Sequence, residues 1–267
     1  MDLQKIIKKK KLKIFIICRI KSKRLKNKIE KRILNKSLLE ILVLRLLKKF
    51  PSEDIIVCTT GKKNIFFSNI KKKYNINIFY GPEDNLFKRL IECSKKFNTN
   101  HFVRITGDNP LTDINTLERM IKIYLKKKLD FIYTNGLFPG LRTEIISIFS
   151  LKKIYKLAQD VNSSEYLTYF YLRDNFNKIY CLKIKKNKKE NKLSITIDYK
   201  KDFLKLKRLI EEKNDIYVDK NYITKKLKID NSIKNQKFIP LITKKYNVKL
   251  KTDTTDQNFL NLKKFYL

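Results

Sequence analysis

The chain has 267 residues, a hydrophobic share of 42% and a formal net charge of +37, so it can build one substantial core, and its charge raises the question of a nucleic-acid partner. The basic residues are mostly lysines spread along the whole chain beside abundant Ile and Asn, with one Ala, no Trp and only 5 Gly. This pattern is typical of codon bias in an AT-rich genome rather than of a basic stripe on one face, so it argues against nucleic-acid binding, and no stretch approaches the roughly 20 apolar residues of a membrane span.

The first half of the chain alternates short apolar runs with segments of helical period. The apolar runs predict strands at Ile14–Cys18, Asp54–Thr59, Ile76–Tyr80, His101–Thr106 and Phe131–Thr134. The periodic segments predict helices at Ser37–Phe50, Asn64–Tyr74, Leu86–Phe97 and Asn115–Lys127. Strands that are apolar throughout and separated by helices predict an α/β fold, a doubly wound and mostly parallel sheet with helices on both faces.

The second half is less regular. Strands are predicted at Glu144–Phe149, Lys178–Lys185 and Leu193–Ile197, and helices at Leu151–Gln159, Glu165–Asn175 and Lys201–Glu212. The loop Lys185–Lys192 is interpreted as a solvated charge run without chemistry. The pattern weakens after about Asp215, so we expect one domain over residues 1–230 and, over the polar, Lys-rich residues 231–267, a helical appendage or a partly ordered tail.

The four cysteines are widely scattered and form no C-x-x-C pair, and His101 is the only histidine, which argues against a zinc site. Three of them lie in apolar runs or on an amphipathic helix, where a free Cys behaves as a small buried hydrophobe. This usage suits a reducing cytosol and predicts a cytoplasmic protein. Lys8–Lys11 followed by Ile14–Cys18 faintly imitates a signal peptide, but the apolar run is short and no cleavage site follows, so we interpret it as a buried first strand.

A cationic loop follows the first strand, at the edge of a doubly wound sheet where ligands bind. It runs from Arg19 to Lys28, and its Arg and Lys side chains are of the kind that bind a triphosphate. The alternative is that any loop in so Lys-rich a chain is cationic. The loop has neither G-x-G-x-x-G nor G-x-x-x-x-G-K, so dinucleotide and P-loop binding are not supported.

Two carboxylates are candidates for a metal site. Asp108 follows Gly107, whose missing side chain lets the backbone turn close to a ligand, and it would lie beside the cationic loop if the first and fourth strands are neighbours. A carboxylate that faces a triphosphate indicates Mg²⁺, which we favour over a simple turn with a helix cap; Asp113 fits the capping role. Asp198 is either the second metal carboxylate or another N-cap.

The residues of these segments resemble a known family. Ile17-Cys-Arg-Ile-Lys-Ser-Lys-Arg-Leu-Lys-Asn-Lys28 resembles the signature R-x-G-S-x-R-L-P-x-K of bacterial cytidylyltransferases, in particular the spore-coat-polysaccharide branch, which is related to the CMP-keto-deoxy-octulosonate and CMP-sialic acid synthetases. The most specific match is Val103-Arg-Ile-Thr-Gly-Asp108. Further matches follow in order over roughly residues 13–230: Leu38-Leu-Glu40, Arg45, Thr59-Thr60, Gly81-Pro-Glu-Asp84 with Arg89, Gly140-Leu with Glu144, Glu165 with Thr168, and Ile195-Thr-Ile-Asp198 with Asp202.

The resemblance implies a Rossmann-like nucleotidyltransferase with Mg²⁺ as cofactor and with CTP and a sugar or sugar acid as partners. In the implied reaction a sugar hydroxyl or a sugar phosphate attacks the α-phosphate of CTP and pyrophosphate leaves, as a step in surface polysaccharide synthesis; a homodimer is one assembly that the family allows. The implied site has Arg19, Lys28 and Asp108 as catalytic residues; Arg19, Ser22, Arg24 and Lys28 on the phosphates; Thr59, Thr60, Asp84 and Arg89 on the rest of the nucleotide; Arg104, Glu144 and Glu165 on the acceptor side; and Asp108 and Asp198 on the metal.

The sequence departs from the family pattern at three positions. Lys21 stands where the signature has Gly, Lys26 where it has Pro, and Tyr166 where His is usual. Lys21 favours an alternative, a catalytically weakened nucleotide-binding relative, whereas the intact Asp108 and Asp198 oppose it. A basic nucleic-acid-binding protein is a further alternative, but it leaves the ordered matches unexplained.

Overall fold

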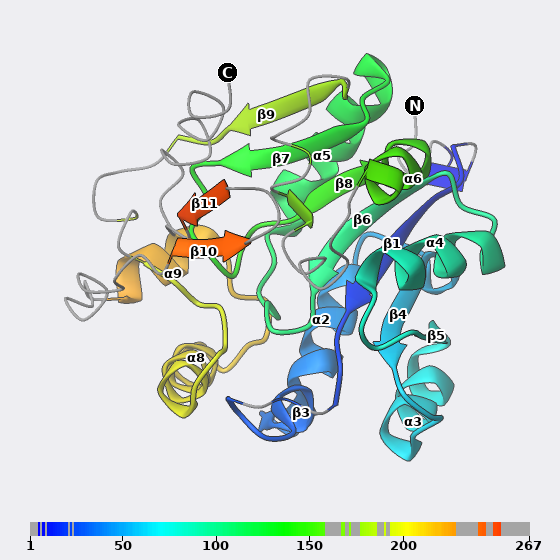
Figure 1. The fold of residues 1–267 in the computed structure, drawn as a ribbon. Helices are drawn as coiled ribbons and strands as arrows, with labels where there is room; N and C mark the ends of the chain where they lie inside the picture. The colour runs from blue at the N-terminus through cyan, green and yellow to red at the C-terminus, as the bar shows by residue number, and fades with distance from the viewer. Residues whose placement is uncertain are drawn as a thin grey trace.

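A seven-stranded sheet of order β5-β4-β1-β6-β8-β7-β9 forms the centre of the computed structural model (Figure 1). The structure describes residues 5, 7–8, 10–20, 22, 24–157, 167–168, 171, 177–185, 190, 193–227, 240–243 and 248–251. The strands of the sheet are β1 Leu12–Ile17, β4 Ile55–Thr60, β5 Asn77–Gly81, β6 His101–Thr106, β7 Phe131–Asn135, β8 Glu144–Ser147 and β9 Ile179–Lys183. β8 runs antiparallel to β6 and β7, and the other pairs are parallel. The predicted mostly parallel α/β sheet is therefore confirmed.

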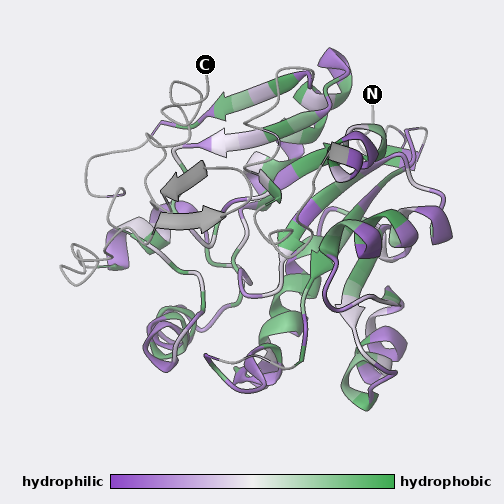
Figure 2. Cartoon of the chain, in the orientation of Figure 1, coloured by the Kyte–Doolittle hydropathy of each residue, from purple (hydrophilic) through white to green (hydrophobic). Residues whose placement is uncertain are grey.

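Helices cover both faces of this sheet because the side chains of each strand alternate between them. Ile14 and Ile16 of β1 pack into one cluster with α2 and α5, whereas Phe15 packs on the opposite face and stacks on Phe102 at 4.8 Å between ring centroids. Figure 2 shows mainly hydrophobic colour on β1, β6 and most of β4, whereas most helices alternate between green and purple and α2 is mostly green. The helices are α2 Leu38–Leu47, α3 Ile65–Tyr74, α4 Leu86–Lys96, α5 Ile114–Lys127, α6 Ile148–Leu157, α8 Lys200–Lys213 and α9 Lys220–Lys226. None of the described helices has the length and apolar composition that a membrane span requires.

Two charged residues of α2 hold neighbouring elements in place. Glu40 accepts a hydrogen bond from the Ser37 backbone N–H at 2.8 Å, which completes a capping box, and binds Lys73 Nζ at 2.8 Å on α3. Arg45 is buried and donates to the backbone carbonyls of Thr112 at 3.2 Å and Ile216 at 3.0 Å. Both belong to the segments that match the family, and their contacts are structural.

The structure corrects the predicted strand Leu193–Ile197. Leu193, Ile195 and Ile197 are buried, but the segment pairs with loops instead of a strand: the Ile195 N–H donates to the Pro139 carbonyl at 2.9 Å. Gly140 has a φ of +99° and a Cβ there would lie 2.4 Å from Ile195 Cγ1, so only glycine lets the two segments pass so closely. An apolar run predicts that a segment is buried, but it does not predict which backbone groups will form hydrogen bonds with it.

One further boundary and one loop residue differ from the prediction. The strand expected over Glu144–Phe149 ends at Ser147, because the Ser147 hydroxyl accepts from the Ser150 N–H at 3.0 Å and α6 starts at Ile148. Within the loop expected to be a solvated charge run, Glu190 is buried and pairs with Lys220 Nζ at 2.8 Å. Most of the predicted helix Glu165–Asn175 lies outside the described residues.

Several short elements were not predicted. The strands β2 Arg32–Ile33 and β3 Lys36–Ser37 form a hairpin, and 3₁₀ helices lie at η1 Lys28–Glu30 and η2 Ser52–Asp54. Near the C-terminus, where a helical appendage or a partly ordered tail was expected, β10 Pro240–Thr243 and β11 Val248–Lys251 form an antiparallel pair. Alternation of apolar and polar residues in Val248-Lys-Leu-Lys251 favours a strand there.

The cysteines behave as predicted. All four are free; Cys18, Cys58 and Cys93 are buried, and Cys181 is partly exposed. Burial raises the pKa of the Cys18 thiol and of the Cys93 thiol well above the ordinary value.

Candidate active site

The candidate site is a cavity of about 610 Å³ at the carboxyl ends of β1 and β6. These two strands are neighbours, with Ile17 opposite Thr106 in register, as the sequence argument requires. Eight of the predicted site residues line the cavity: Arg19, Ser22, Arg24, Lys28, Asp84, Arg89, Arg104 and Asp108. Glu83, for which no role was predicted, lines it as well.

Gly107 lets the loops after β1 and β6 meet. Its N–H donates to the Ile17 carbonyl at 2.9 Å. A Cβ at this position would lie 2.7 Å from the Cys18 Cβ, closer than real side chains approach each other. The residue before Asp108 is therefore glycine because of a close backbone approach, and its φ plays no part.

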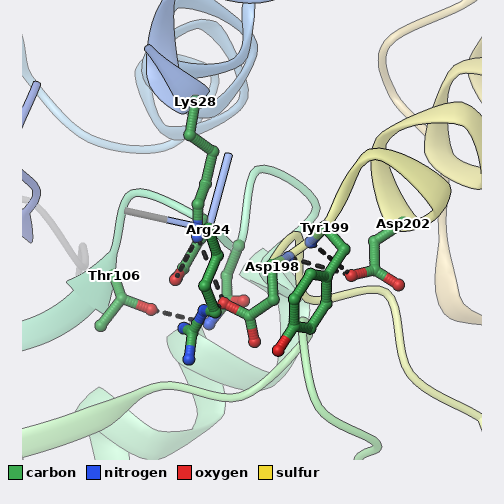
Figure 3. A network of polar contacts seen from close by, with 8 residues as sticks. Arg24, Lys28, Thr106, Asp198, Tyr199 and Asp202 are labelled. Carbon is green, nitrogen blue, oxygen red and sulfur yellow. Dashed lines mark hydrogen bonds and ion pairs between the residues drawn. The ribbon is translucent and has the colours of Figure 1, made fainter. Parts of the chain in front are cut away.

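Lys28 lies between two carboxylates (Figure 3). Its side chain is only 9% exposed, and its Nζ is 3.3 Å from Oδ2 of Asp108 and 3.3 Å from Oδ1 of Asp198. Arg24 also binds Asp198, with Nη2 to Oδ1 at 2.5 Å. Two segments 90 residues apart thus bring their carboxylates to one ammonium group, because the Ile197 N–H donates to the Asp108 carbonyl at 3.1 Å.

The structure shows which residues cap the helices next to these aspartates. Asp113 is the N-cap of α5 and accepts from the Asn115 N–H at 3.2 Å, as predicted. At α8 the N-cap residue is Tyr199, and Asp202 in the first turn accepts from the N–H groups of Asp198 at 3.1 Å and of Tyr199 at 2.8 Å. The Asp198 carboxylate caps no helix and points to Lys28 and Arg24.

Arg104, which lines the cavity, is paired with Glu144, which does not. They are opposite each other on the antiparallel strands β6 and β8, and Arg104 Nη1 is 2.8 Å from Glu144 Oε2. Their side chains are 15% and 14% exposed, so water screens this pair less than a surface pair. Thr168 Oγ1 also donates to Glu144. Glu165, which was also predicted to line the acceptor side, lies outside the described residues.

Arg89 is buried on α4 and faces the cavity across the β5–α4 loop. Its Nη1 donates to the Pro82 carbonyl at 3.3 Å. A Cβ at Gly81 would lie 2.7 Å from Arg89 Cγ, so this glycine makes room for the arginine stem. Thr59 and Thr60 end β4 beside the site, but neither is among the residues that line the cavity.

The carboxylates fit a hard divalent cation better than zinc. Asp108 and Asp198 are 27% and 33% exposed and offer oxygen atoms alone. Among the described residues there is no cluster of three or more His, Cys, Asp or Glu that could hold a metal by itself. Mg²⁺ binds through one or two carboxylates plus phosphate and water oxygens, whereas zinc sites take three or four protein ligands, often His or Cys.

Comparison with protein families gives one match over most of the chain. Residues 14–233 match the family described as cytidylyltransferase. An uncharacterized protein of Methanocaldococcus jannaschii is 34% identical over 197 residues, which is 73% of this chain and 81% of that protein. The spore coat polysaccharide biosynthesis protein SpsF of Bacillus subtilis is 25% identical over 165 residues, 60% of this chain and 68% of that protein.

Solved structures agree in fold. A cytidylyltransferase from Leptospira borgpetersenii superposes with a TM-score of 0.72 at 26% identity and covers 86% of this chain and 98% of its own. A CMP:2-keto-3-deoxy-manno-octonic acid synthetase in complex with CTP superposes with a TM-score of 0.59 at 12% identity, covering 76% of this chain and 99% of its own, which is a likeness of fold alone.

Proposed function

The chain belongs to the cytidylyltransferase family and is a nucleotidyltransferase, and on this premise we propose that it transfers CMP from CTP to a sugar acid or a related sugar, with release of pyrophosphate, in surface polysaccharide synthesis. The spore coat polysaccharide biosynthesis protein and the synthetase in complex with CTP support the sugar and the nucleotide in this proposal. The free cysteines suit a reducing compartment, so we place the reaction in the cytoplasm.

The observation that carries the proposal is the position of Lys28. A buried ammonium group between two partly exposed carboxylates, at the edge of the sheet, is an arrangement of charges that suits a metal–triphosphate complex. Arg24 brings a second basic group to the Asp198 carboxylate and adds to the positive charge beside the proposed phosphate site.

In the proposed reaction an acceptor oxygen forms a bond to the α-phosphorus of CTP. The bond from that phosphorus to the bridging oxygen breaks, and pyrophosphate leaves with the electron pair. Arg19, Ser22, Arg24 and Lys28 would bind the phosphate oxygens through charge-assisted hydrogen bonds. Lys28 is buried and held by two partners, so it needs little reorganisation to stabilise the charge that grows on the leaving pyrophosphate.

The other predicted residues complete this proposal. Asp108 and Asp198 would hold Mg²⁺, which when bound would neutralise phosphate charge. Arg104, fixed by Glu144, would orient the acceptor, and Asp84 and Arg89 would lie against the nucleotide. The roles of Thr59 and Thr60 in nucleotide binding and of Glu165 on the acceptor side stay predictions.

The test is pyrophosphate release from each of the four NTPs with Mg²⁺, against a panel of sugar acids and sugar phosphates. Asp108→Asn keeps the shape of the side chain and removes its charge. Glu118→Gln is the matched control, because Glu118 is an ion-paired carboxylate on α5 with Lys49 at 3.4 Å, outside the residues that line the cavity. We expect release with CTP, lost in Asp108→Asn and kept in Glu118→Gln.

Two results would count against the proposal. Equal release from all four NTPs would remove CTP as the specific substrate. Tight CTP binding with no turnover on any acceptor would favour the catalytically weakened relative, in which case Lys21 in place of the signature glycine is the first residue to revert.

A further inference from the structure

Tyr199 stands beside the phosphate-binding residues and has no assigned role. It directly follows Asp198, its side chain is at the surface, and the residue is 51% exposed. The Arg24 guanidinium lies over its ring, with Cζ 5.9 Å from the ring centroid. Figure 3 shows the ring of Tyr199 next to Arg24 and Asp198.

We propose that Tyr199 is a positioning residue for the transfer reaction, whose ring holds the Arg24 guanidinium toward the triphosphate site. This inference rests on the proposed function, because it takes Arg24 as a phosphate ligand. The ring acts through Arg24 and does not itself touch the reacting atoms.

Arg24 needs such support because of where it lies. It is on an irregular loop and its side chain is 57% exposed, so an unsupported guanidinium would sample many rotamers and lose that freedom when it binds phosphate. The Asp198 carboxylate restrains it, but Asp198 is also the proposed metal ligand. A cation at Asp198 would compete with Arg24 for the same carboxylate oxygens, whereas the neutral ring of Tyr199 would keep its attraction for the guanidinium.

The backbone fixes the ring in this place. Asp202 accepts hydrogen bonds from the N–H groups of both Asp198 and Tyr199, at 3.1 and 2.8 Å. The two adjacent residues are thus mounted on the first turn of α8 as one unit. A change that moves one of them would move the other.

The experiment measures the KM and kcat for CTP, together with CTP binding by calorimetry, in Tyr199→Leu. Loss of an exposed cation–π contact predicts a KM and a Kd about two- to fivefold higher, with little change in kcat. Tyr199→Phe keeps the ring and is expected to restore the wild-type KM. Phe149→Leu is the matched control: Phe149 is 67% exposed with Lys153 Nζ 4.4 Å from its ring centroid, on α6 and outside the residues that line the cavity.

A double variant tests whether Tyr199 acts through Arg24. In an Arg24→Gln background, Tyr199→Leu is expected to have no further effect on CTP binding. An equal loss in both backgrounds, or a wild-type KM in Tyr199→Leu, would overturn the inference while leaving the proposed function intact. Wild-type protein that binds no CTP would overturn both.

Discussion

Replacing Lys28 by methionine keeps most of the buried aliphatic side chain and removes the ammonium group that lies 3.3 Å from both Asp108 and Asp198. Two effects follow. The carboxylates lose their shared partner and repel each other, which lowers stability. The proposed phosphate site loses a preorganised cation, which lowers the rate of transfer.

The size of the stability effect follows from burial. A charge pair at this distance attracts with about 5 kcal/mol at an effective dielectric constant of 20, and burying the ammonium group costs several kcal/mol in return. Because the carboxylates are 27% and 33% exposed, water can solvate them once the partner is gone. We therefore expect a loss of about 2 kcal/mol, or roughly 4–8 °C in the unfolding temperature.

The rate effect is larger. Removing one preorganised group that stabilises transition-state charge costs about 10²–10³-fold in kcat. The assay is pyrophosphate release with CTP at saturating Mg²⁺, alongside thermal unfolding with and without Mg²⁺. Because a divalent cation can neutralise the two carboxylates that Lys28 leaves, added Mg²⁺ is expected to raise the unfolding temperature more in Lys28→Met than in the wild type.

Lys13→Met is the matched control. Lys13 on β1 is also partly buried, at 22% side-chain exposure, and pairs with Asp54, outside the residues that line the cavity. It is expected to lose stability while keeping kcat/KM. The reasoning fails if Lys28→Met keeps the wild-type kcat/KM, or if Lys13→Met loses as much activity as Lys28→Met.

Three further predictions follow from charge, burial and titration. The net charge of +37 attracts an anionic nucleotide over the whole surface, so kcat/KM for CTP should fall as KCl rises from about 0.05 to 0.5 M, where screening shortens the range of this attraction; a salt-independent value would contradict it. Iodoacetamide should label the native enzyme at Cys181 and leave the three buried cysteines unmodified, as peptide mass spectrometry would show; a native-state adduct on Cys18 would disprove the burial argument. Burial alone would raise the pKa of Glu40, but hydrogen bonds from Lys73, Ser37 and Tyr74 lower it from 4.5 to about 2. The folded pKa is thus below the unfolded one, so the stabilisation is present above about pH 4.5 and is lost as the pH falls toward 2; because Lys73 is 54% exposed, we expect about 1–2 kcal/mol, measured by urea unfolding of wild type and Glu40→Gln across this range, and a constant difference between the two would refute it.

Periodicity predicted the elements of the first half because β1 and β4 are almost completely buried and the helices α4 and α5 each have an apolar face. Periodicity did not predict that β8 runs antiparallel to its neighbours, because a short apolar run has the same pattern in a parallel and in an antiparallel strand. Leu193–Ile197 failed as a strand for a related reason. Its apolar residues are buried like those of β1, but its N–H groups donate to the carbonyls of Pro139 and Asp108 in loops, and in the described part of the chain it pairs with no strand.

The site was predictable where a residue type is scarce and its place in the chain is fixed by a strand end. Asp108 meets this condition because it follows the scarce Gly107 at the end of β6. Lys28 does not, because lysine is abundant in this chain, and only the resemblance of its loop to the family signature pointed to it. Asp198 was ambiguous, because an aspartate before a helix suits both capping and metal binding. The structure shows that Tyr199 is the N-cap of α8 and that Asp202 accepts hydrogen bonds from the N–H groups of Asp198 and Tyr199, and the metal role of Asp198 stays a prediction. The sequence did not single out Tyr199 as a site residue, because it is one of 14 tyrosines and belongs to no motif.

The ratio of acidic to basic side chains at the candidate site differs from that of the whole chain. The whole chain has 63 basic and 26 acidic residues, but at the site five basic side chains face five carboxylates. The basic ones are Arg19, Arg24, Lys28, Arg89 and Arg104; the acidic ones are Glu83, Asp84, Asp108, Glu144 and Asp198. A chain whose lysines reflect codon bias would place its few acids at random, and a site made only to attract anions would exclude them. Acids gathered near basic residues suit the proposed site, in which a divalent cation would bring the charge that the triphosphate needs, and lysines elsewhere on the surface would supply the long-range attraction of the nucleotide.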